Sequence, residues 1–421
     1  MPAAGAAHRL RLRAAACGLS LVLVMGACSS STQAVQPVTL QVVMADDWVT
    51  PPYVAAVRDF ERAHPGVTVS TTKTPFGLMR DTVQADIANH HPPDVVHYHA
   101  FAAAAQGMAQ QVDDLWTGHL QPSEFLPGAV EDVTWAGHRY GVPLDSNALL
   151  LMYNDNAFQA AHLPLAGAPT TFSEIVRISP ALSAADGTRK AFTIPTSDWW
   201  TYGWIRANGG EVLSAGPDGK PKITLDDPAV VQALSFLAGL VQKGYAFPPR
   251  SAASSSGDAL ALFQGGQAAM YASGSWDVAP LRSQLAGFHV AAMPAGKPGL
   301  PEATALGGSS LFIPKGSTHR ELAFEFMLTL TADQYALRFA SEQGRLPVRP
   351  RLFQNPVFKD ADLQVYVQHL SAAHPYTLEA FPPAKQAFQQ ALDEILRQGH
   401  PPAEALARAQ ATAVAALGTS P

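Results

Sequence analysis

Cysteine is nearly absent from this sequence of 421 residues. The two cysteines, Cys17 and Cys28, both lie close to the N-terminus. A chain that begins at Cys28 has no second thiol, so no internal disulfide holds its fold together. Charged residues are also scarce, at 15%, with a formal net charge of −6 and no run of lysine or arginine. Because nucleic-acid binding favours a basic surface, this balance argues against a nucleic-acid partner.

Repeats and long apolar runs are missing as well. No motif recurs at a fixed period, which argues against solenoids and propellers, and no low-complexity tract is long enough to suggest disorder. After the N-terminal region, no segment is long and apolar enough to span a bilayer. With 47% hydrophobic residues, the chain is typical of a globular protein and long enough for two domains of about 100–200 residues each.

Residues 1–27 are predicted to be a signal peptide. A basic stretch over residues 8–13 precedes an apolar run over residues 14–25, which is shorter than the roughly 20 residues of a transmembrane helix. The sequence Met25-Gly26-Ala27-Cys28 then resembles the bacterial lipobox, in which small residues precede a cysteine that becomes the acylated first residue. This resemblance predicts a lipid anchor at Cys28, followed by a flexible polar tether to residue 37. The alternative is an ordinary secreted protein with an incidental cysteine.

Strands and helices alternate in the first quarter of the remaining chain. Strands are predicted over residues 38–43, 67–70 and 94–97. Two helices lie between them, one capped by Thr50 and one over residues 80–89. This order predicts an α/β unit with a largely parallel sheet.

Helix-start signals mark the rest of the chain. Capping boxes are predicted at residues 171–174 and 318–321, and Asp226-Asp227-Pro228 is expected to start a helix. Two further helices are expected over residues 384–398 and 403–417. Residues 216–220 indicate a turn, which we expect to close a hairpin.

Four groups of short motifs follow one another between residues 137 and 347. They cover residues 137–143 with 151–154, residues 169–174, residues 263–270 with 274–276, and residues 307–308 with 313–317 and 344–347. Each motif is a weak signal alone. Together and in this order they make the chain resemble the extracellular solute-binding proteins of ABC-type sugar importers, the maltose-binding type.

The resemblance implies a two-lobed α/β fold of the periplasmic-binding-protein type, with a ligand cleft between lobes that crossover strands join. We expect one lobe to hold residues 38–145 plus 290–330 and the other to hold residues 146–289 plus 331–421. The resemblance also implies a sugar ligand, the permease subunits of an ABC importer as partners, and a monomer. It implies no cofactor and no enzymatic activity.

A sugar site needs two kinds of side chain. Aromatic rings pack on the apolar faces of sugar rings, and carboxylates, amides and arginine make directional hydrogen bonds to hydroxyl groups. Candidates therefore lie at strand ends, on the crossover, in an aromatic cluster near residue 200, and at glycines that allow close approach. The predicted ligand-binding residues are Asp46, Asp47, Trp48, Tyr98, Asp145, Asn147, Trp199, Trp200, Tyr202, Gly274, Trp276, Gly308 and Arg345.

The candidates also have structural explanations, which the sequence leaves open. Asp46 and Asp47 can serve only to start a helix. Asp145 can hold a structural bond at a hinge instead of a ligand. Core packing accounts for two of the aromatic residues between positions 199 and 204, and Gly308 can belong to a plain turn.

Four histidines lie at short spacings that suit zinc, namely His90, His91, His97 and His99. No other set of Asp, Glu and His completes such a site, so no metal is predicted. Residues 96–101 are instead expected to form a wall of the cleft, where Tyr98 or His99 contacts the ligand.

Three other functions remain open at this point. The same fold could bind a glycerophosphodiester or polyol phosphate, for which additional arginine and histidine are suited. A secreted hydrolase of glycans would need two carboxylates with separated pKa values. Asp46, Asp47 and Asp145 are available for that role, but no nucleophile motif such as G-x-S-x-G is found. A scaffold or adhesin would not need the aromatic and carboxylate set.

Cys28→Ala should abolish membrane attachment, because the acylated cysteine is the only predicted hold on the membrane. Blots of membrane and soluble fractions compare the variant with the parent chain, and uncleaved or soluble protein is the expected result. Equal retention of both chains in the membrane fraction would contradict the lipid anchor.

Overall fold

A computed structural model describes residues 37–164, 167–195, 197–215, 221–250, 257–285 and 287–418. The predicted signal peptide, Cys28 and the turn at residues 216–220 lie outside the described residues. The strands on either side of that turn, β9 (Leu213–Ala215) and β10 (Pro221–Ile223), pair antiparallel, as the expected hairpin requires.

The first sheet contains the three strands predicted near the N-terminus. These strands are β1 (Val38–Ala45), β2 (Val67–Thr74) and β3 (Val95–Tyr98), with β1 in the middle and parallel to both neighbours. The long strand β14 (Thr304–Phe312) pairs antiparallel with β3 and with β6 (Gly141–Ala148), and parallel with the short β15 (Ala373–His374). The predicted α/β unit is thus confirmed, and antiparallel partners extend its parallel part.

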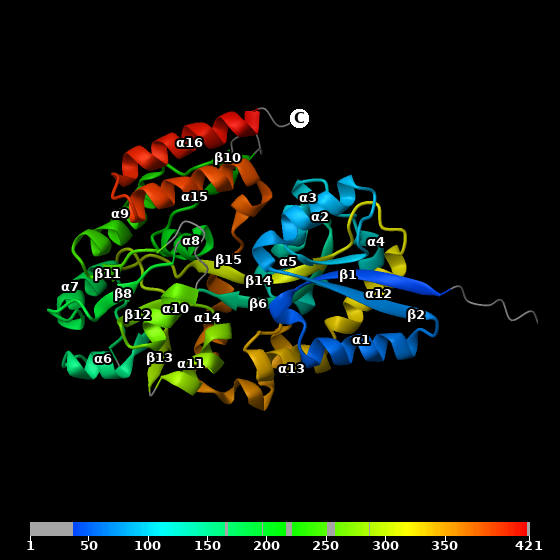
Figure 1. The fold of residues 1–421 in the computed structure, drawn as a ribbon, viewed down its shortest axis with the longest axis horizontal. Helices are drawn as coiled ribbons and strands as arrows, with labels where there is room; N and C mark the ends of the chain where they lie inside the picture. The colour runs from blue at the N-terminus through cyan, green and yellow to red at the C-terminus, as the bar shows by residue number, and fades with distance from the viewer. Residues whose placement is uncertain are drawn as a thin grey trace, which may run out of the picture. The chain divides into compact units, whose positions relative to one another are not determined.

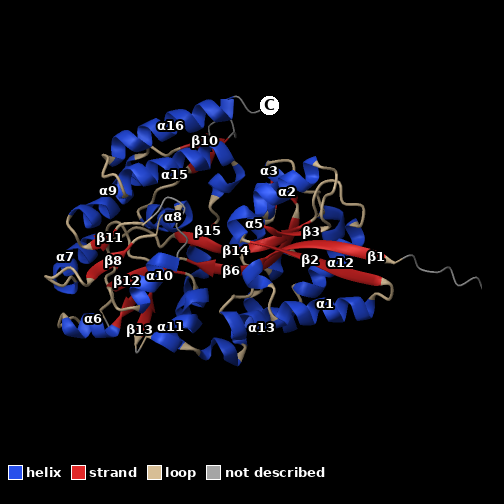
Figure 2. Cartoon of the chain, in the orientation of Figure 1, coloured by secondary structure: helices blue, strands red, loops and turns tan. Residues whose placement is uncertain are grey.

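Helices lie on both sides of this sheet (Figure 2). One side carries α1 (Pro51–Ala63), α12 (Arg320–Leu330) and α13 (Asp333–Gln343), which pack against one another. Their contact is aromatic, because the rings of Phe60 and Phe326 meet edge to face at 5.1 Å. The remaining helices of this lobe are α2 (Met79–Ala88), α3 (Ala100–Ala105), α4 (Asp113–Trp116) and α5 (Pro127–Asp132), and β4 (Thr134–Trp135) pairs with β5 (His138–Arg139).

The second sheet has the strand order β11-β8-β12-β7-β13. Its strands are β7 (Leu150–Asn154), β8 (Lys190–Thr193), β11 (Ala246–Phe247), β12 (Ala268–Ser273) and β13 (Phe288–Ala291). β8 is parallel to β11 and β12, whereas β7 is antiparallel to β12 and β13. β7 therefore runs in one direction, and β8, β11, β12 and β13 run in the opposite direction.

The helices around the second sheet include three that the sequence predicts. These are α9 (Pro228–Gln242), α15 (Pro382–Leu396) and α16 (Pro402–Gly418), and all three pack together. The others are α6 (Asp155–Ala160), α7 (Phe172–Leu182), α8 (Asp198–Ala207), α10 (Gly257–Gln264), α11 (Val278–Gln284) and α14 (Ala361–His369). Within the described part of the chain, no helix combines the length and the hydropathy needed to cross a membrane.

Of the two predicted capping boxes, the one before α7 is confirmed as an N-cap and the one before α12 is wrong. The hydroxyl of Thr171 accepts a hydrogen bond from the backbone N–H of Glu174 at 3.3 Å. The N-cap of α12 is His319, whose side chain makes no cap. Ser317 fixes this turn instead, because its hydroxyl accepts from the N–H of His319 and donates to Asp94 at 2.7 Å.

β6 and β14 pass between the two sheets (Figure 1). β6 belongs to the first sheet and, after Leu149, the chain continues directly as β7 of the second. Leu149 is held to β14 on both sides of its peptide: its N–H donates to Ala305 at 3.0 Å, and its carbonyl accepts from Thr304 at 2.6 Å. β6 and β7 are buried along their whole length. The crossover is thus a buried part of the structure.

The predicted division of the chain between the lobes stays a prediction. Residues 37–421 form one compact unit. The chain also passes between the sheets more often than the three predicted boundaries describe, since β15, within residues 331–421, lies in the first sheet.

Gly141, at the start of β6, has no room for a side chain. A Cβ atom there would lie 2.3 Å from the carbonyl oxygen of Leu311 and 2.7 Å from the Cβ of Ala100. Gly141→Ala should therefore lower the free energy of unfolding by about 1–3 kcal/mol, the usual cost of overpacking.

Gly239→Ala is the matched control in the same urea-unfolding measurement. Gly239 lies within α9, and a Cβ atom there would meet nothing within 4 Å. Replacing a helical glycine by alanine in open space should stabilise the chain by up to about 1 kcal/mol. Equal stability of the two variants would contradict the close packing of β6 on β14.

Candidate binding site

A chain of hydrogen bonds joins three buried side chains on neighbouring strands, His97 of β3, Ser309 of β14 and Asp145 of β6. The hydroxyl of Ser309 donates to Oδ1 of Asp145 at 2.6 Å, and Nε2 of His97 lies 2.6 Å from the same hydroxyl. Nδ1 of His97 accepts from the backbone N–H of Ala45. Because Nδ1 is an acceptor, Nε2 carries the proton and donates to Ser309.

This set does not have the order of a catalytic triad. In such a triad the carboxylate orients the histidine, and the histidine takes the proton of the serine. Here Asp145 bonds to Ser309 instead, and Nδ1 of His97 is occupied by the backbone. Burial, with the nearby Arg345 cation, holds the pKa of His97 well below its ordinary value. The arrangement therefore gives no support to the hydrolase hypothesis.

Asp145 and Asn147 lie two residues apart on β6 and therefore share one face of the strand. Oδ1 of Asn147 accepts from the backbone N–H of Ser275 at 2.9 Å. Oδ2 of Asp145 and Nδ2 of Asn147 are buried but have no hydrogen-bond partner among the described residues. An unpartnered buried polar group costs about 1–3 kcal/mol. One acceptor and one donor at this place thus remain available to a bound molecule.

Three tryptophans gather beside these atoms, namely Trp199 and Trp200 of α8 and Trp276 of the short helix η4 (Ser275–Asp277). The ring of Trp199 lies 4.6 Å from that of Trp200 and 5.6 Å from that of Trp276. All three rings are partly exposed. Two of the indole N–H groups donate to backbone carbonyls, that of Trp199 to Leu306 at 2.7 Å and that of Trp200 to Ala272 at 2.9 Å.

Glycines let these rings lie directly on the backbone. A Cβ atom at Gly307 would lie 2.9 Å from the ring of Trp199 and 3.1 Å from that of Trp276. A Cβ atom at Gly274 would lie 2.2 Å from the ring of Trp276. Gly308, with φ of 128°, would place a Cβ atom 2.5 Å from the carbonyl oxygen of Asp145. Any side chain at these positions would push the tryptophans or β6 away from β14.

Arg345 lies between two tryptophans that come from different sheets. Its guanidinium is 5.2 Å from the ring centre of Trp48, which follows β1, and 5.8 Å from that of Trp276, which follows β12. It also forms an ion pair with Asp47, whose side chain is exposed. Cation–π contacts of this kind favour a fixed guanidinium position. Asp46 is exposed beside the pair, and Oδ1 of Asp46 accepts from the N–H of Asp47 at 2.9 Å.

The turn before Arg345 sets its position. Gly344 ends α13 in the left-handed conformation, with φ of 67°, and a Cβ atom there would lie 2.5 Å from the carbonyl oxygen of Ser275. The backbone N–H of Ser146 donates to the carbonyl of Leu346 at 2.9 Å. The residue between these two anchors is Arg345, which is therefore held close to the crossover strand.

Two predicted residues lie apart from this cluster. Tyr202 is fully buried, its hydroxyl donates to Glu211 at 3.2 Å, and its ring packs on Tyr376. The hydroxyl of Tyr98 donates to Glu379 at 2.8 Å. Of the thirteen predicted residues, the structure thus brings together those around Asp145, Trp276 and Arg345, and it brings neither Tyr98 nor Tyr202 to them.

A group of charged side chains lies beside Tyr98. His99 of this group is among the residues expected in the cleft wall, whereas Asp132, Asp198, Glu379 and Lys385 are not among the predicted site residues. Lys385 pairs with Glu379 and lies 3.7 Å from Oδ2 of Asp198. His99 forms a pair with Asp132 at 2.7 Å. Their positions in the sequence carry no common motif. The position of Asp198 in the first turn of α8, directly before the tryptophans, could have indicated an acidic group there, because carboxylates are favoured at helix N-termini.

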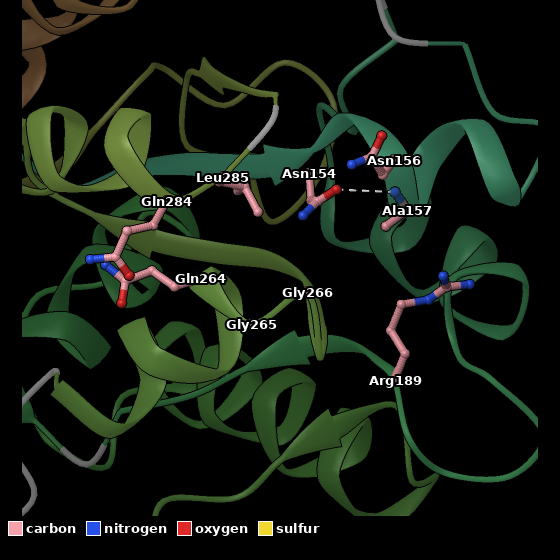
Figure 3. A pocket seen from close by; sticks show the side chains of 9 residues that line it. All are labelled: Asn154, Asn156, Ala157, Arg189, Gln264, Gly265, Gly266, Gln284 and Leu285. Carbon is pink, nitrogen blue, oxygen red and sulfur yellow. Dashed lines mark hydrogen bonds between the residues drawn. The ribbon is translucent and has the colours of Figure 1, made fainter.

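Two cavities in the second lobe lie away from the tryptophan cluster. The larger, of about 350 Å³, has a mostly polar lining that includes Asn154, Arg189, Gln264 and Gln284 (Figure 3). The other, of about 240 Å³, lies between Pro169 and Leu300. Neither contains a residue of the predicted site. We favour the tryptophan cluster as the binding site. The polar atoms buried beside it, Oδ2 of Asp145 and Nδ2 of Asn147, have no partner in the described ranges, and its rings suit a ligand face.

The described residues contain no group of three or more His, Cys, Asp and Glu side chains that could hold a metal ion. His97 and His99, considered above for zinc, point to different partners. His97 bonds to Ser309 and His99 to Asp132.

Residues 55–364 match the family described as bacterial extracellular solute-binding protein. The match spans well over half of the chain. This chain belongs to that family. As an extracellular solute-binding protein, it acts outside the cytoplasm by binding a solute. The predicted family and the predicted two-lobed α/β fold are thus confirmed.

Relatives with curated names are distant. The maltotriose-binding protein of Pyrococcus abyssi is 22% identical over 303 residues, a match that covers 70% of this chain and 63% of the relative. Among solved structures, the GacH receptor of Streptomyces glaucescens, studied with acarbose, superposes with a TM-score of 0.78 at 20% identity, covering 91% of this chain and 99% of that one. The structure of UgpB of Mycobacterium tuberculosis in complex with glycerophosphocholine superposes with a TM-score of 0.78 at 21% identity, covering 90% of this chain and 98% of UgpB. These likenesses show the fold.

Asp145 should make the stability of the fold depend on pH. Burial raises the pKa of Asp145 to about 6, against the opposing effects of Arg345 and Ser309. Since the folded protein holds this proton more tightly than the unfolded chain, the stability from this group is present at low pH and lost as pH rises through 4 to 6. Asp145→Asn should remove that loss. As pH rises from 4 to 6, the free energy of unfolding of the variant should therefore increase relative to that of the parent by a few kcal/mol, on the order of 1.4 kcal/mol per pKa unit.

Urea unfolding of both chains between pH 4 and 7 measures this difference. Asp46→Asn is the control, because it removes a carboxylate that is exposed. The difference in free energy of unfolding between this variant and the parent should not change with pH. A constant difference between Asp145→Asn and the parent across this range would contradict the buried, proton-binding carboxyl.

Proposed function

We propose that this chain is the substrate-binding component of an ABC importer and that its solute is a carbohydrate, held between the two lobes and delivered to the permease. The family and the fold support solute binding. One relative is named for binding maltotriose, and one structural neighbour was solved in complex with acarbose. Both support a carbohydrate as the solute.

The observation that carries the proposal is the combination of flat rings and unpartnered polar atoms at one place. Trp199, Trp200 and Trp276 offer ring faces for the C–H face of a sugar. Beside them, Oδ2 of Asp145 can accept hydrogen bonds from hydroxyl groups, and Nδ2 of Asn147 can donate them. A carbohydrate supplies an apolar face and hydroxyl groups together, so it satisfies both features at once.

A glycerophosphodiester is the second candidate, and Arg345 is the observation that favours it. The guanidinium is fixed between Trp48 and Trp276, close to the unpartnered atoms. Its fork of N–H donors matches two phosphate oxygens. A phosphate would have to replace Asp47 as its partner, which is feasible because that carboxylate is exposed. UgpB with glycerophosphocholine shares the fold.

Binding between the lobes requires that they separate and close. The hydrogen bond from Trp199 to Leu306, for example, now joins α8, one of the helices around the second sheet, to β14 of the first sheet. A solute would take the place of some contacts of this kind. The family's two-lobed fold suits a hinge motion of this kind, in which a few residues at the crossover absorb the change.

The anchor belongs to the proposal too. Acylation of Cys28 would hold the chain at the outer face of the cell membrane, where the permease is also located. A single chain is sufficient for this role, so we propose a monomer.

A thermal-shift screen distinguishes the two candidate solutes. Mono-, di- and trisaccharides are compared with sn-glycerol 3-phosphate and glycerophosphocholine. A solute present at 100 times its dissociation constant should stabilise the fold by about 2.7 kcal/mol. Stabilisation by saccharides alone supports the leading proposal, and stabilisation by the phosphates alone supports the second. No shift with any of them would contradict both.

Trp276→Ala should weaken solute binding at least about tenfold, equivalent to roughly 1.4 kcal/mol, and change the melting temperature of the free protein by only a few degrees. Its partly exposed ring rests on Gly274 and Gly307, so its loss opens no enclosed cavity. Calorimetric titration with the best saccharide of the screen, together with melting curves, measures both quantities.

Trp204→Ala is the matched control for the tryptophan test. Trp204 lies on α8 with Trp199 and Trp200 but is buried against Phe172 and Phe192. Its truncation should cost about 3–5 kcal/mol of stability, as in other cores, with little effect on the affinity of the folded fraction. If Trp276→Ala behaved like Trp204→Ala, the tryptophan cluster would be core and the carbohydrate proposal would lose its main support.

A further inference from the structure

Ser309, His97 and Asp145 lie on one face of the first sheet because three neighbouring strands pair there. Ser309 of β14 stands directly opposite Asp145 of β6. His97 of β3 stands opposite Leu311, two residues further along β14. Paired residues, and residues two apart on a strand, have their side chains on the same face of a sheet. The register of the strands therefore produces the chain of hydrogen bonds described above.

The tryptophan cluster lies on the same face. Asn147 stands opposite Gly307, two residues before Ser309 on β14. A Cβ atom at Gly307 would lie 3.2 Å from the Cβ of Asn147 and 3.1 Å from the ring of Trp276. Asn147 in turn shares its face of β6 with Asp145. The hydrogen-bonded chain thus ends at Asp145 on the side of β6 and β14 where the rings gather.

Three contacts fix the imidazole of His97. Its Nδ1 accepts from the backbone N–H of Ala45 at 3.4 Å. The rings of Trp48 and Phe76 meet it edge to face, with 5.1 and 5.4 Å between ring centres. Burial and the nearby Arg345 cation lower its pKa well below the ordinary value, so the ring stays neutral with its proton on Nε2.

The hydrogens of this chain run in one direction, from His97 through Ser309 to Asp145. Nε2–H of His97 donates to the hydroxyl oxygen of Ser309, and the single hydroxyl hydrogen of Ser309 is directed at Oδ1 of Asp145. Oδ2 is the carboxylate atom with no partner in the described part of the chain. When the carboxyl takes up a proton, this proton resides on Oδ2 and changes that atom from an acceptor into a donor.

We propose that Ser309 and His97 are positioning residues of the solute site, which hold one oxygen of Asp145 so that the other, Oδ2, accepts a hydrogen bond from a solute hydroxyl. This inference rests on the carbohydrate function proposed above and adds the residues that set its acceptor. A hydrogen bond to an ionised acceptor is roughly twice as strong as one between neutral groups. The solute therefore binds best to the chain in which Asp145 is ionised.

This preference makes solute affinity depend on pH. Burial raises the pKa of Asp145 to about 6, opposed by Arg345 and the Ser309 hydrogen bond and assisted by the charges of Asp47 and Asp132. At pH 5 the ionised fraction is about one tenth, and the apparent affinity falls with it. Calorimetric titration of the full mature chain with the saccharides of the thermal-shift screen, beginning with maltotriose, should show binding about tenfold weaker at pH 5 than at pH 7.5.

Asp145→Asn separates Asp145 from the other groups near the cluster whose pKa values are shifted. Burial also raises the pKa of Asp277 to about 6. Against burial, which lowers it, the Asp132 carboxylate raises the pKa of His99 above its ordinary value. Asp145→Asn keeps both groups, so its affinity should be equal at the two pH values to within about threefold and weaker than that of the parent at pH 7.5.

Ser309→Ala and His97→Leu test the positioning. Without the hydroxyl of Ser309, the charged form of Asp145 loses a hydrogen bond, so the midpoint of the affinity profile should move to higher pH. The affinity at pH 7.5 should fall by about threefold or more. His97→Leu should move the midpoint in the same direction, because the Ser309 hydroxyl is no longer directed. His97→Gln, whose amide N–H takes the place of Nε2–H, should restore the parent midpoint.

Ser310→Ala is the matched control. Its hydroxyl is buried on the same strand but donates to Asp132 at 2.7 Å instead of to Asp145. The midpoint of this variant should stay in place, whatever its melting temperature. The ¹³C resonance of the Asp145 carboxyl, assigned by its absence from Asp145→Asn, gives the midpoint of the parent and of each variant without solute.

The outcomes separate the inference from the proposed function. Saccharide binding by the parent with equal affinity at pH 5 and 7.5 would overturn the acceptor role of Asp145 and leave the carbohydrate function standing. A midpoint that stays in place in both Ser309→Ala and His97→Leu, or that moves equally in Ser310→Ala, would overturn the positioning role. Binding of no saccharide would overturn the proposed function and the inference with it.

Discussion

The pairing of β6 with β14 is the constraint on which the rest of the structure depends. β14 also pairs with β3 and β15 of the first sheet, and β6 continues through Leu149 into the second sheet. Because this crossing is buried, no side chain near it can rely on water to satisfy its polar atoms. Gly308, with its positive φ and its close contact with Asp145, permits the two strands to approach at the register shift beside Ser309.

The same constraint explains how a binding site can form at the crossing. Aspartate and asparagine on a buried strand are costly unless something bonds to them. Ser309 satisfies one oxygen of Asp145, and the backbone of Ser275 satisfies the side-chain oxygen of Asn147. One polar atom of each side chain is then left without a partner in the part of the chain that the structure describes. A molecule held there gains hydrogen bonds that the protein alone does not make, and the tryptophans beside it add apolar contact. Stability is thus given up at the place where binding recovers it.

The sequence predicts the first three strands, several of the helices and the family, because these depend on local periodicity, caps and short motifs. It also predicts that Asp145, Trp276 and Arg345 belong to one site, through motifs that recur in the family. It could not separate Tyr202 from Trp199, since residues three apart on a helix share a face and only tertiary packing decides which ring is enclosed. It could not find the pairing of Tyr98 with Glu379 either, because 281 residues separate them and neither lies in a recognised motif. The predicted box at residues 318–321 failed for a related reason: Ser317, held by the distant Asp94, fixes that turn.

Small-angle scattering with and without the best-binding saccharide tests the central claim, that the solute is held between the lobes, most directly. Lobes joined by crossover strands should close around a solute, so the radius of gyration should fall when the saccharide is added at saturation. Trp276→Ala, at a concentration where it binds little, should show no fall. An unchanged radius of gyration for the parent chain, with binding confirmed by calorimetry in the same sample, would contradict the account.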